Sequence, residues 1–392
     1  MGNLSRQDEV QATRRVPGAA ASNPLLELTR LGQSVWIDYL DRNRIKSGEI
    51  RRYIEEDGLR GMTSNPTIFE KAIIGAAAYE EPVRALAALG KSAADIYESI
   101  VTRDVQIAAD ELRGVFDQLD GRDGFVSLEV SPLLAFDTDG TLAEARRLWA
   151  AVNRPNLMIK VPATTAGIPA IARLIDDGIN VNVTLLFGLD RYQEVADAYL
   201  SGLEARASRG ETVRIASVAS FFLSRIDVMV DAKLDELEKA GQVAPFVAER
   251  LRGQTAIASA RTAFQMYKRT FRGGVRFQAL AAKGARPQRL LWASTSTKNP
   301  AYSDVKYVEA LIGEDTINTV PLETFAAYRD HGRPARRIED DLGATQSVLH
   351  GLGDIGIELG AVTAQLEQDG VRKFSDSYAH VLRAIEQRRT AV

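Results

Sequence analysis

One lysine stands inside an otherwise apolar run of the sequence. The run "LMIKVP", residues 157–162, has apolar residues on both sides of Lys160 and ends at a proline, which is typical of a buried strand. A lysine is almost never buried without a partner or a chemical task. Loss of hydration favours the neutral amine, which can attack a carbonyl carbon and form a Schiff base. Lys160 is therefore a candidate nucleophile.

Two carboxylates occupy similar apolar runs. Glu129 lies in "SLEVS" and Asp38 lies in "VWIDY". Carboxylates beside an amine can shuttle the protons that imine formation requires. One amine and two carboxylates therefore predict carbon–carbon bond chemistry through an enamine. Two alternatives stay open from the residues alone. Lys160 and Glu129 could form a purely structural buried ion pair, or the lysine could hold pyridoxal phosphate. We favour catalysis, because perturbed ionisable groups cluster at functional sites.

Short apolar segments alternate with longer segments of helical periodicity from residue 31 onward. This alternation predicts parallel strands joined by helices. A closed (β/α)8 barrel accounts for the strand candidates better than an open, doubly wound sheet. The candidates are residues 34–40, 58–66, 124–132, 157–163, 180–188, 214–222, 289–295 and 316–322.

Polar residues share one face of several strand candidates. In "NVNVTLL", residues 180–186, asparagine and threonine alternate with valine and leucine. Successive side chains on a strand point to opposite faces, and helices cover the apolar face of a barrel. The polar face must then point into the barrel, where unpaired polar groups are too costly for a packed core. Such residues belong at the carboxyl ends of the strands, where barrel enzymes have their active sites.

Helices are expected outside the repeated units as well. Residues 226–272, between the sixth and seventh strand candidates, predict a helical insertion on the outside of the barrel, and residues 336–392 predict further C-terminal helices. No linker rich in proline and glycine separates a second domain. We therefore expect a single barrel domain over residues 26–392, preceded by a polar tail over residues 1–25.

The composition argues against several classes of protein. The chain has 392 residues, a formal net charge of −3, no cysteine and three histidines. A nearly balanced charge argues against nucleic-acid or anionic-membrane binding, and no apolar run approaches the roughly 18 residues of a membrane helix. Disulfides, thiolate zinc sites and thiol nucleophiles need cysteine, which this chain lacks, and the histidines are not at ligand spacing. The N-terminal segment lacks the apolar core of a secretory signal, and we expect a cytoplasmic protein.

Five motifs, in order along the chain, resemble those of the transaldolase family of the pentose phosphate pathway. They are "GMTSNPTIFEKAI" (61–73), "SLEVSP" (127–132), "MIKVPAT" (158–164), "VNVTLLF" (181–187) and "WASTSTKNPAYSD" (292–304). The resemblance covers most of residues 31–330, extends to "VRKFSDSY" (371–378), and is greatest with the long bacterial branch of the family. It implies a (β/α)8 barrel whose fourth strand carries the Schiff-base lysine, here Lys160.

The resemblance also implies roles for other polar residues. Glu129 would be the acid and base that acts through a bound water during imine formation and hydrolysis. Asp38 would take the proton from the C4 hydroxyl of the donor and return it to the acceptor carbonyl. Thr184 would help to hold the water, while Asn65 and Asn182 would bind hydroxyls of the dihydroxyacetone unit.

A phosphate site is expected after the sixth and seventh strands. Arg225 lies in "SFFLSRID", and arginine is the natural bidentate partner of phosphate. In the same segment Ser220 and Phe222 are expected to contact substrate. After the seventh strand we assign Ser294 and Lys298, a lysine standing where the family has arginine. Lysine binds phosphate as a point charge and lacks the planar fork of arginine.

The reaction that the resemblance implies is the reversible transfer of a dihydroxyacetone unit from sedoheptulose 7-phosphate to glyceraldehyde 3-phosphate. The products are erythrose 4-phosphate and fructose 6-phosphate. No metal or organic cofactor is expected, because the lysine imine is the electron sink. The expected partners are sugar phosphates, and the expected state is a monomer or homodimer.

Two alternatives to this reaction are retained. A fructose 6-phosphate aldolase of the same superfamily would carry tyrosine where this chain has Phe222. A catalytically inactive sugar-phosphate-binding protein could use the same barrel, although every catalytic position here is filled by the expected residue type. Lys71, in the first motif, is interpreted as a solvated surface lysine.

Overall fold

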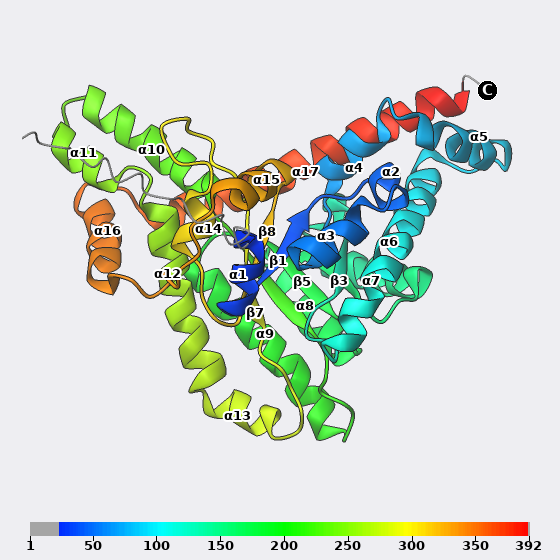
Figure 1. Ribbon diagram of the computed structural model, residues 1–392, viewed down its shortest axis with the longest axis horizontal. Helices are drawn as coiled ribbons and strands as arrows, with labels where there is room; N and C mark the ends of the chain where they lie inside the picture. The colour runs from blue at the N-terminus through cyan, green and yellow to red at the C-terminus, as the bar shows by residue number, and fades with distance from the viewer. Residues whose placement is uncertain (1–22, 391–392) are drawn as a thin grey trace, which may run out of the picture.

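Eight parallel strands close into a barrel in the computed structural model, which describes residues 23–390 (Figure 1). Each strand pairs with its neighbours in the sequence, and β1 pairs with β8 to close the barrel. The predicted (β/α)8 fold is confirmed and the open, doubly wound alternative is wrong. The strands are β1 (Gln33–Asp38), β2 (Leu59–Thr63), β3 (Phe125–Glu129), β4 (Leu157–Pro162), β5 (Val181–Leu186), β6 (Ser217–Phe222), β7 (Arg289–Ala293) and β8 (Thr316–Val320).

All eight predicted strands are present, but most end earlier than predicted. Helix caps and prolines explain the difference. β2 ends at Thr63 because the side chain of Asn65 caps the first turn of helix α4 (Pro66–Ile73), which begins with a proline. β8 ends before Pro321, which leads directly into helix α15 (Leu322–His331).

Helices cover the outside of the barrel and connect the strands. Short 3-10 helices, η1 (Ala77–Tyr79) and η2 (Pro132–Leu134), lie in the connections after β2 and β3. The remaining helices of the repeated units are α1 (Pro24–Arg30), α2 (Arg42–Lys46), α3 (Glu49–Asp57), α5 (Glu80–Ala88), α6 (Ala93–Gln118), α7 (Thr138–Val152), α8 (Gly167–Asp176), α9 (Leu189–Ser208) and α14 (Lys306–Ala310).

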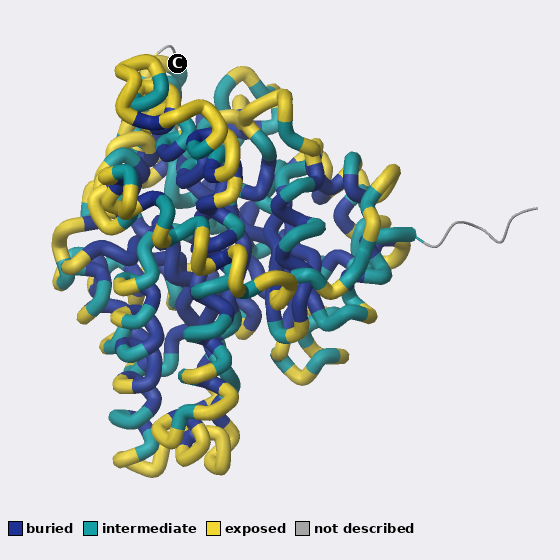
Figure 2. The backbone as a smooth tube through the Cα atoms, turned by 90° about the vertical axis from the view of Figure 1, so that its left-hand side faces the viewer, coloured by how far each residue is buried: buried dark blue, intermediate teal, exposed yellow. Residues whose placement is uncertain are grey.

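The outer helices turn their apolar faces toward the sheet. In α8, Ala170, Ile171 and Leu174 are fully buried, and this spacing matches one face of a helix. The neighbouring α9 approaches closely at Gly202, where an added Cβ would lie 2.5 Å from the carbonyl oxygen of Ala172. Figure 2 shows the result, with buried residues through the middle of the molecule and exposed residues along its periphery.

Additional helices lie between β6 and β7, where the sequence predicts an insertion. They extend farther than the predicted residues 226–272, because a last helix follows them before β7. These elements are α10 (Ser224–Lys239), α11 (Pro245–Leu251), α12 (Thr255–Tyr267), the π-helix η3 (Lys268–Arg272) and α13 (Val275–Ala281).

The chain ends in further helices, as predicted. Helix α16 (Leu342–Asp354) packs on α12, and the long α17 (Leu359–Thr390) runs across α4, α6 and α10, at the top of Figure 1. The predicted polar tail, 1–25, lies outside the described residues except for its last three, which begin α1. Within residues 23–390, no helix has both the length and the apolar composition that crossing a membrane requires.

A hydrogen-bonded cluster fills the barrel interior near the amino ends of the strands. The carboxylate of Asp123 accepts hydrogen bonds from Ser34 Oγ (2.5 Å), Trp36 Nε1 (2.8 Å) and Arg289 Nη2 (3.1 Å). These donors come from β1 and β7, and Asp123 precedes β3. The buried charge is therefore fully partnered, and the cluster ties separate strands together at this end.

Candidate functional site

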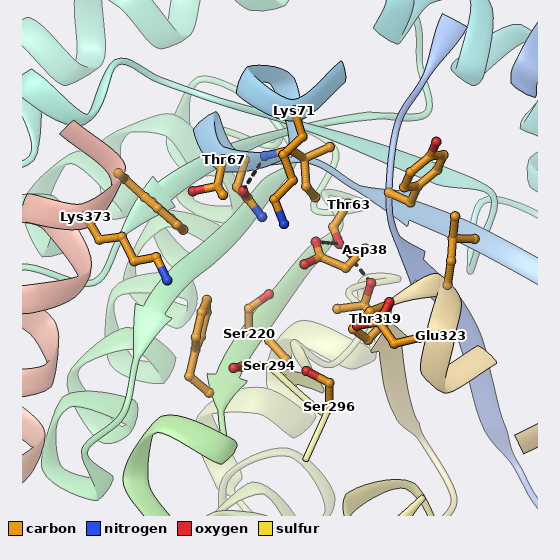
Figure 3. Close-up of a pocket in the computed structure, with 18 of the residues that line it drawn as sticks. Asp38, Thr63, Thr67, Lys71, Ser220, Ser294, Ser296, Thr319, Glu323 and Lys373 are labelled. Atoms are coloured by element: carbon orange, nitrogen blue, oxygen red, sulfur yellow. Dashed lines mark hydrogen bonds between the residues drawn. The ribbon is translucent and has the colours of Figure 1, made fainter. Parts of the chain in front are cut away.

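A cavity of about 420 Å³ opens at the carboxyl ends of the strands (Figure 3). Strands β1, β2, β4, β6, β7 and β8 contribute residues to its wall, and helices α4 and α17 contribute residues to its rim. The position agrees with the location of active sites in barrels of this kind. The cavity brings together these residues that the sequence singled out: Asp38, Asn65, Lys160, Ser220, Phe222, Arg225, Ser294 and Lys298.

Lys160 reaches the cavity from the middle of β4 and is 3% exposed. Its Nζ donates a hydrogen bond to the carbonyl oxygen of Ser64 (3.1 Å) and lies 3.8 Å from Glu129 Oε2. The strand register explains this neighbourhood, because Glu129 of β3 and Asn182 of β5 stand level with Lys160 on either side. The Lys160 amine therefore lies between polar residues of the two neighbouring strands and also faces the cavity, which a ligand can enter.

Glu129 is buried without the partners that a buried carboxylate normally has. Its side chain is 3% exposed, and neither carboxylate oxygen has a hydrogen-bond partner within the described residues. Burial raises the pKa of Glu129 to about 7, and the charge of Lys160 opposes that rise only in part. A carboxyl group with this pKa can both donate and accept a proton near neutrality.

A second, smaller cavity of about 30 Å³ adjoins Glu129. This space exceeds the roughly 10–15 Å³ that one water molecule needs. Tyr97 of α6 and Tyr378 of α17 line it, so α17 also contributes to the surroundings of Glu129. Thr184, on β5, has a buried Oγ1 with no hydrogen-bond partner in the part of the chain that the structure describes.

Asp38 lies across the cavity at the end of β1. Thr63 Oγ1 donates a hydrogen bond to Asp38 Oδ1 (2.6 Å) and also contacts Thr319 Oγ1 (2.8 Å), as Figure 3 shows. Burial raises the pKa of Asp38, while Lys160 and the hydrogen bond from Thr63 oppose the rise. A raised pKa makes the carboxylate a better base than an exposed aspartate would be.

Asn182 and Thr184 do not line the large cavity, although the sequence places them among the site residues. The Asn182 amide donates to Ser127 Oγ (2.9 Å) and accepts from Ser220 Oγ (2.6 Å), so it bridges three strands behind the cavity wall. Asn65 differs, because its side-chain oxygen caps α4 while the residue itself lines the cavity. Glu129 also lies behind the wall, next to Lys160.

The residues expected at a phosphate site surround one side of the cavity. The Arg225 guanidinium lies 5.5 Å from the ring centre of Phe222. Ser294 Oγ contacts Ser224 Oγ (2.9 Å), and Ser294 has a φ of 54°, in the left-handed region. Lys298 Nζ donates a hydrogen bond to Ser296 Oγ (2.5 Å). These groups leave a polar, cationic pocket on the β6 and β7 side.

Two lysines at the cavity were not assigned from the sequence. Lys71 of α4 is exposed, as a surface lysine would be, yet it lines the cavity together with Lys373 of α17. The ammonium groups of both point toward the cavity in Figure 3. Lys71 lies in the motif 61–73 and Lys373 in the segment 371–378, both of which carry the resemblance to the family. Membership of these segments was the feature of the sequence that could have identified the two lysines.

Charged side chains are unevenly distributed around the cavity. The charges of Arg225, Lys298 and Lys71 all act on Lys373. The carboxylates of the lining are Asp38, Asp41 and Glu323, and the charge of Glu323 acts on Asp38. Such an arrangement orients a molecule that carries an anionic group at one end. Within residues 23–390, no group of three or more histidine, aspartate or glutamate side chains is placed to hold a metal ion.

Comparisons with known proteins agree with this geometry. The profile of the family described as "Transaldolase/Fructose-6-phosphate aldolase" matches residues 35–385. The chain is 47% identical to a transaldolase of Trichodesmium erythraeum over 94% of its own length and 98% of the relative. It is also 47% identical to a transaldolase of Saccharopolyspora erythraea, over 92% of this chain and 96% of that one. A transaldolase of Thiobacillus denitrificans is similar to the same degree, 47%, over 92% of this chain and 98% of the relative.

Proposed function

This chain belongs to the transaldolase/fructose-6-phosphate aldolase family, and from its site we propose that it reversibly transfers a dihydroxyacetone unit. The donor is sedoheptulose 7-phosphate, the acceptor is glyceraldehyde 3-phosphate, and the products are erythrose 4-phosphate and fructose 6-phosphate. One observation carries the proposal. A buried amine, Lys160, lies in the wall of the cavity that also holds Asp38. It is 3.8 Å from Glu129, a buried carboxylate whose oxygens have no hydrogen-bond partner among the described residues.

The sugar phosphate binds with its phosphate on the cationic side of the cavity. Arg225 supplies a planar fork for the phosphate oxygens, and Lys298 supplies a point charge. Ser294 adds a hydroxyl donor beside Arg225. The carbonyl end of the sugar then lies toward Lys160, with Asn65 and Ser220 available for its hydroxyls. Asn182 orients Ser220 through the hydrogen bond between them.

The first chemical step joins the sugar to Lys160. Glu129 takes a proton from the ammonium group, and the free amine adds to the C2 carbonyl to give a carbinolamine. Glu129 then returns its proton to the departing hydroxyl, which leaves as water, and a positively charged imine remains. Thr184, whose Oγ1 has no hydrogen-bond partner among residues 23–390, helps to hold the water that this step releases and that hydrolysis consumes.

The second step breaks the C3–C4 bond. Asp38 takes the proton from the C4 hydroxyl, the C3–C4 bond electrons move into the imine, and an aldehyde leaves. The enamine that remains on Lys160 attacks the carbonyl of the acceptor aldehyde, and Asp38 returns its proton to the new hydroxyl. The imine that re-forms is then hydrolysed by the reverse of the first step: water adds to C2, the product ketose leaves, and Lys160 is restored as an ammonium group. No oxidant or reductant is consumed, and each step can run in either direction.

An aldolase that releases free dihydroxyacetone is the second candidate function. The side chain at position 222 bears on the choice, because it faces the cavity and packs 5.2 Å from the ring centre of Phe187. An apolar phenyl ring offers no hydrogen bond to a water that could protonate and hydrolyse the enamine. The enamine therefore survives until an acceptor arrives, which favours transfer over release.

A coupled assay for three-carbon transfer tests the proposal. Fructose 6-phosphate and erythrose 4-phosphate are supplied, and glyceraldehyde 3-phosphate is detected as it forms. The parent chain is expected to be active, and Lys160→Ala is expected to lose about 10⁴-fold or more of the rate, since no other nucleophile replaces the amine. Lys283→Ala, an exposed lysine outside the cavity, is the control and should retain the parental rate. Transfer at the parental rate by Lys160→Ala would overturn the proposal.

Cellular context and assembly belong to the same proposal. The chain acts in the cytoplasm as a monomer or homodimer, and residues 26–392 behave as one folding unit. The absence of cysteine in the sequence fits a reducing compartment.

Contacts of α17 with α4 and α6 support a single unit, because they join the two ends of the chain. Light scattering after size-exclusion chromatography distinguishes the two oligomeric states, and a larger assembly would contradict both.

A further inference from the structure

Four cationic side chains line the large cavity, and within the described residues none of them forms an ion pair with the carboxylates that also line it, Asp38, Asp41 and Glu323. Arg225, Lys298, Lys71 and Lys373 all line it. Among the described residues, the ion pair of this region joins Lys160 to Glu129, and it leaves the four cations without an acidic partner. Unscreened like charges repel one another, so a folded protein holds them together only where its packing imposes the arrangement.

The packing of helix α17 against the barrel brings its lysine, Lys373, close to the other cations. At Gly370 an added Cβ would lie 2.8 Å from Leu185 Cδ2 and 3.5 Å from Arg225 Nη1, so the helix approaches the barrel closely at this position. Phe374 packs with its ring centre 5.9 Å from the Arg225 guanidinium. Positions 370, 373 and 374 share one face of a helix. Lys373 is therefore directed to the same side of the cavity as Arg225.

The helix is anchored by groups outside the cation cluster. Ser377 Oγ contacts Thr67 Oγ1 of α4 (2.9 Å), and the His380 ring contacts the carboxylate of Glu70, also on α4. α4 carries Lys71 as well, so one helix–helix contact places two of the cations. Partial burial lowers the pKa of Lys373, and the charges of Arg225, Lys298 and Lys71 lower it further.

We propose that Lys373 binds the phosphate group of the sugar substrate from the side opposite the barrel, so that the C-terminal helix forms part of the substrate site. The inference rests on the proposed function, whose substrates carry a phosphate. A phosphate dianion neutralises the repulsion among the surrounding cations and accepts hydrogen bonds from several of them. Arg225 supplies the planar fork, and the Lys373 ammonium supplies a point charge with freely rotating donors.

Matched variants of α17 test the role of Lys373. Inorganic phosphate is used as the probe of the subsite, through its inhibition constant in the transfer assay, beside the KM for fructose 6-phosphate. In Lys373→Gln both constants are expected to rise by about 10- to 100-fold, the range of a lost charge-assisted hydrogen bond. The rise in KM should exceed the fall in kcat, and Lys373→Arg should recover most of the loss.

The neighbouring arginine provides the control. Arg372 is exposed and pairs with Asp369 on the same helix, so Arg372→Gln removes a cation from α17 outside the cavity. Its constants should match those of the parent chain. A parental KM and inhibition constant in Lys373→Gln, at an unchanged Tm, would overturn the proposal. A loss of equal size with unphosphorylated fructose as donor would overturn it too, because a missing phosphate contact cannot affect that substrate.

Direct binding separates this inference from the proposed function. If the parent chain transferred no three-carbon unit, the proposed function would fail, but calorimetric titration with inorganic phosphate would still report on the subsite. Weaker binding by Lys373→Gln than by the parent chain and Arg372→Gln supports the role of Lys373. Equal binding by all three, or no binding by the parent chain, contradicts it.

Discussion

The two ends of the barrel interior hold similar groups in opposite arrangements. At the amino end, Asp123 accepts hydrogen bonds from Ser34, Trp36 and Arg289. At the carboxyl end, Glu129 has no hydrogen-bond partner for either oxygen within residues 23–390 and lies 3.8 Å from Lys160. Both carboxylates are buried, and both lie near a cation from another strand.

The difference separates a structural charge from a reactive one. A buried charge that is fully hydrogen-bonded joins the elements around it and is held in one state. A buried charge without hydrogen-bond partners costs stability, and a fold retains it where the group has a chemical task. The amino end therefore stabilises the barrel, whereas the carboxyl end keeps an amine and a carboxyl group available to a substrate.

The largest effect is expected on catalysis at the carboxyl end. Glu129→Gln should lower kcat by about 10²- to 10⁴-fold, because the amide cannot exchange protons with Lys160 and the carbinolamine. Asp123→Asn, the matched change at the amino end, should leave the kcat of folded protein within about twofold of the parent, since Asp123 is remote from the reacting atoms. A comparable loss of kcat in both variants would erase the distinction between the two ends.

The free energy of unfolding, in contrast to kcat, should fall when the carboxylate at the amino end is changed. Asp123→Asn should reduce the free energy of unfolding by about 3–5 kcal/mol, because it leaves the partly buried Arg289 without its counter-charge. Urea titration of the variant and the parent chain measures the change. If Asp123→Asn unfolded at the parental urea concentration, the amino-end cluster would not have the stabilising role assigned to it.

Glu129→Gln should instead stabilise the protein above neutral pH. The pKa of Glu129 is raised from its ordinary value of 4.5 to about 7 in the folded chain. The folded state therefore holds the proton more tightly than the unfolded state, and stability falls as the pH rises from 4.5 to about 7. This cost is about 3 kcal/mol above pH 7, from about 1.4 kcal/mol per pKa unit, and the amide does not incur it.

Urea titrations of Glu129→Gln and the parent chain at pH 5 and pH 8 test this sign. The stabilisation by the amide should be larger at pH 8. An equal effect at both pH values, or a variant less stable than the parent chain at pH 8, would contradict this prediction. It would show that ionised Glu129 does not destabilise the folded state.

The smallest effect concerns the fate of the enamine. Phe222→Tyr should increase the release of free dihydroxyacetone from fructose 6-phosphate alone by up to about tenfold, the worth of one hydrogen bond to an attacking water. Phe246→Tyr, an exposed phenylalanine of α11, is the matched control. Release in the absence of an acceptor is measured enzymatically. An unchanged rate in Phe222→Tyr would mean that this ring does not govern the choice between transfer and release.

The barrel and its catalytic centre could be predicted because both depend on local pattern. Apolar runs predicted all eight strands, and the alternation within them predicted which side chains point inward. Once the strands are parallel and in sequence order, Glu129 and Lys160 must stand on neighbouring strands, and their register places them level. The residue types at these positions then favour Schiff-base chemistry, and the resemblance to the transaldolase family specifies the reaction.

The rim of the cavity could not be predicted in the same way. The charge pattern of α17 is that of a solvated helix, and the contact that directs Lys373 to the cavity depends on the approach at Gly370. The pairing of the Asn182 amide with Ser127 and Ser220 is likewise set by the three-dimensional register of three strands. Sequence indicated the residue types in both cases but not the tertiary contact that decides their exposure to a ligand.

Reductive trapping reports whether Lys160 forms the Schiff base with the substrate. The parent chain is incubated with fructose 6-phosphate, reduced with borohydride, digested and examined by mass spectrometry. A covalent adduct on the peptide that contains Lys160, absent from Lys160→Ala, is the predicted result. No adduct, or an adduct on a different lysine that persists in Lys160→Ala, would contradict the assignment of this amine as the nucleophile.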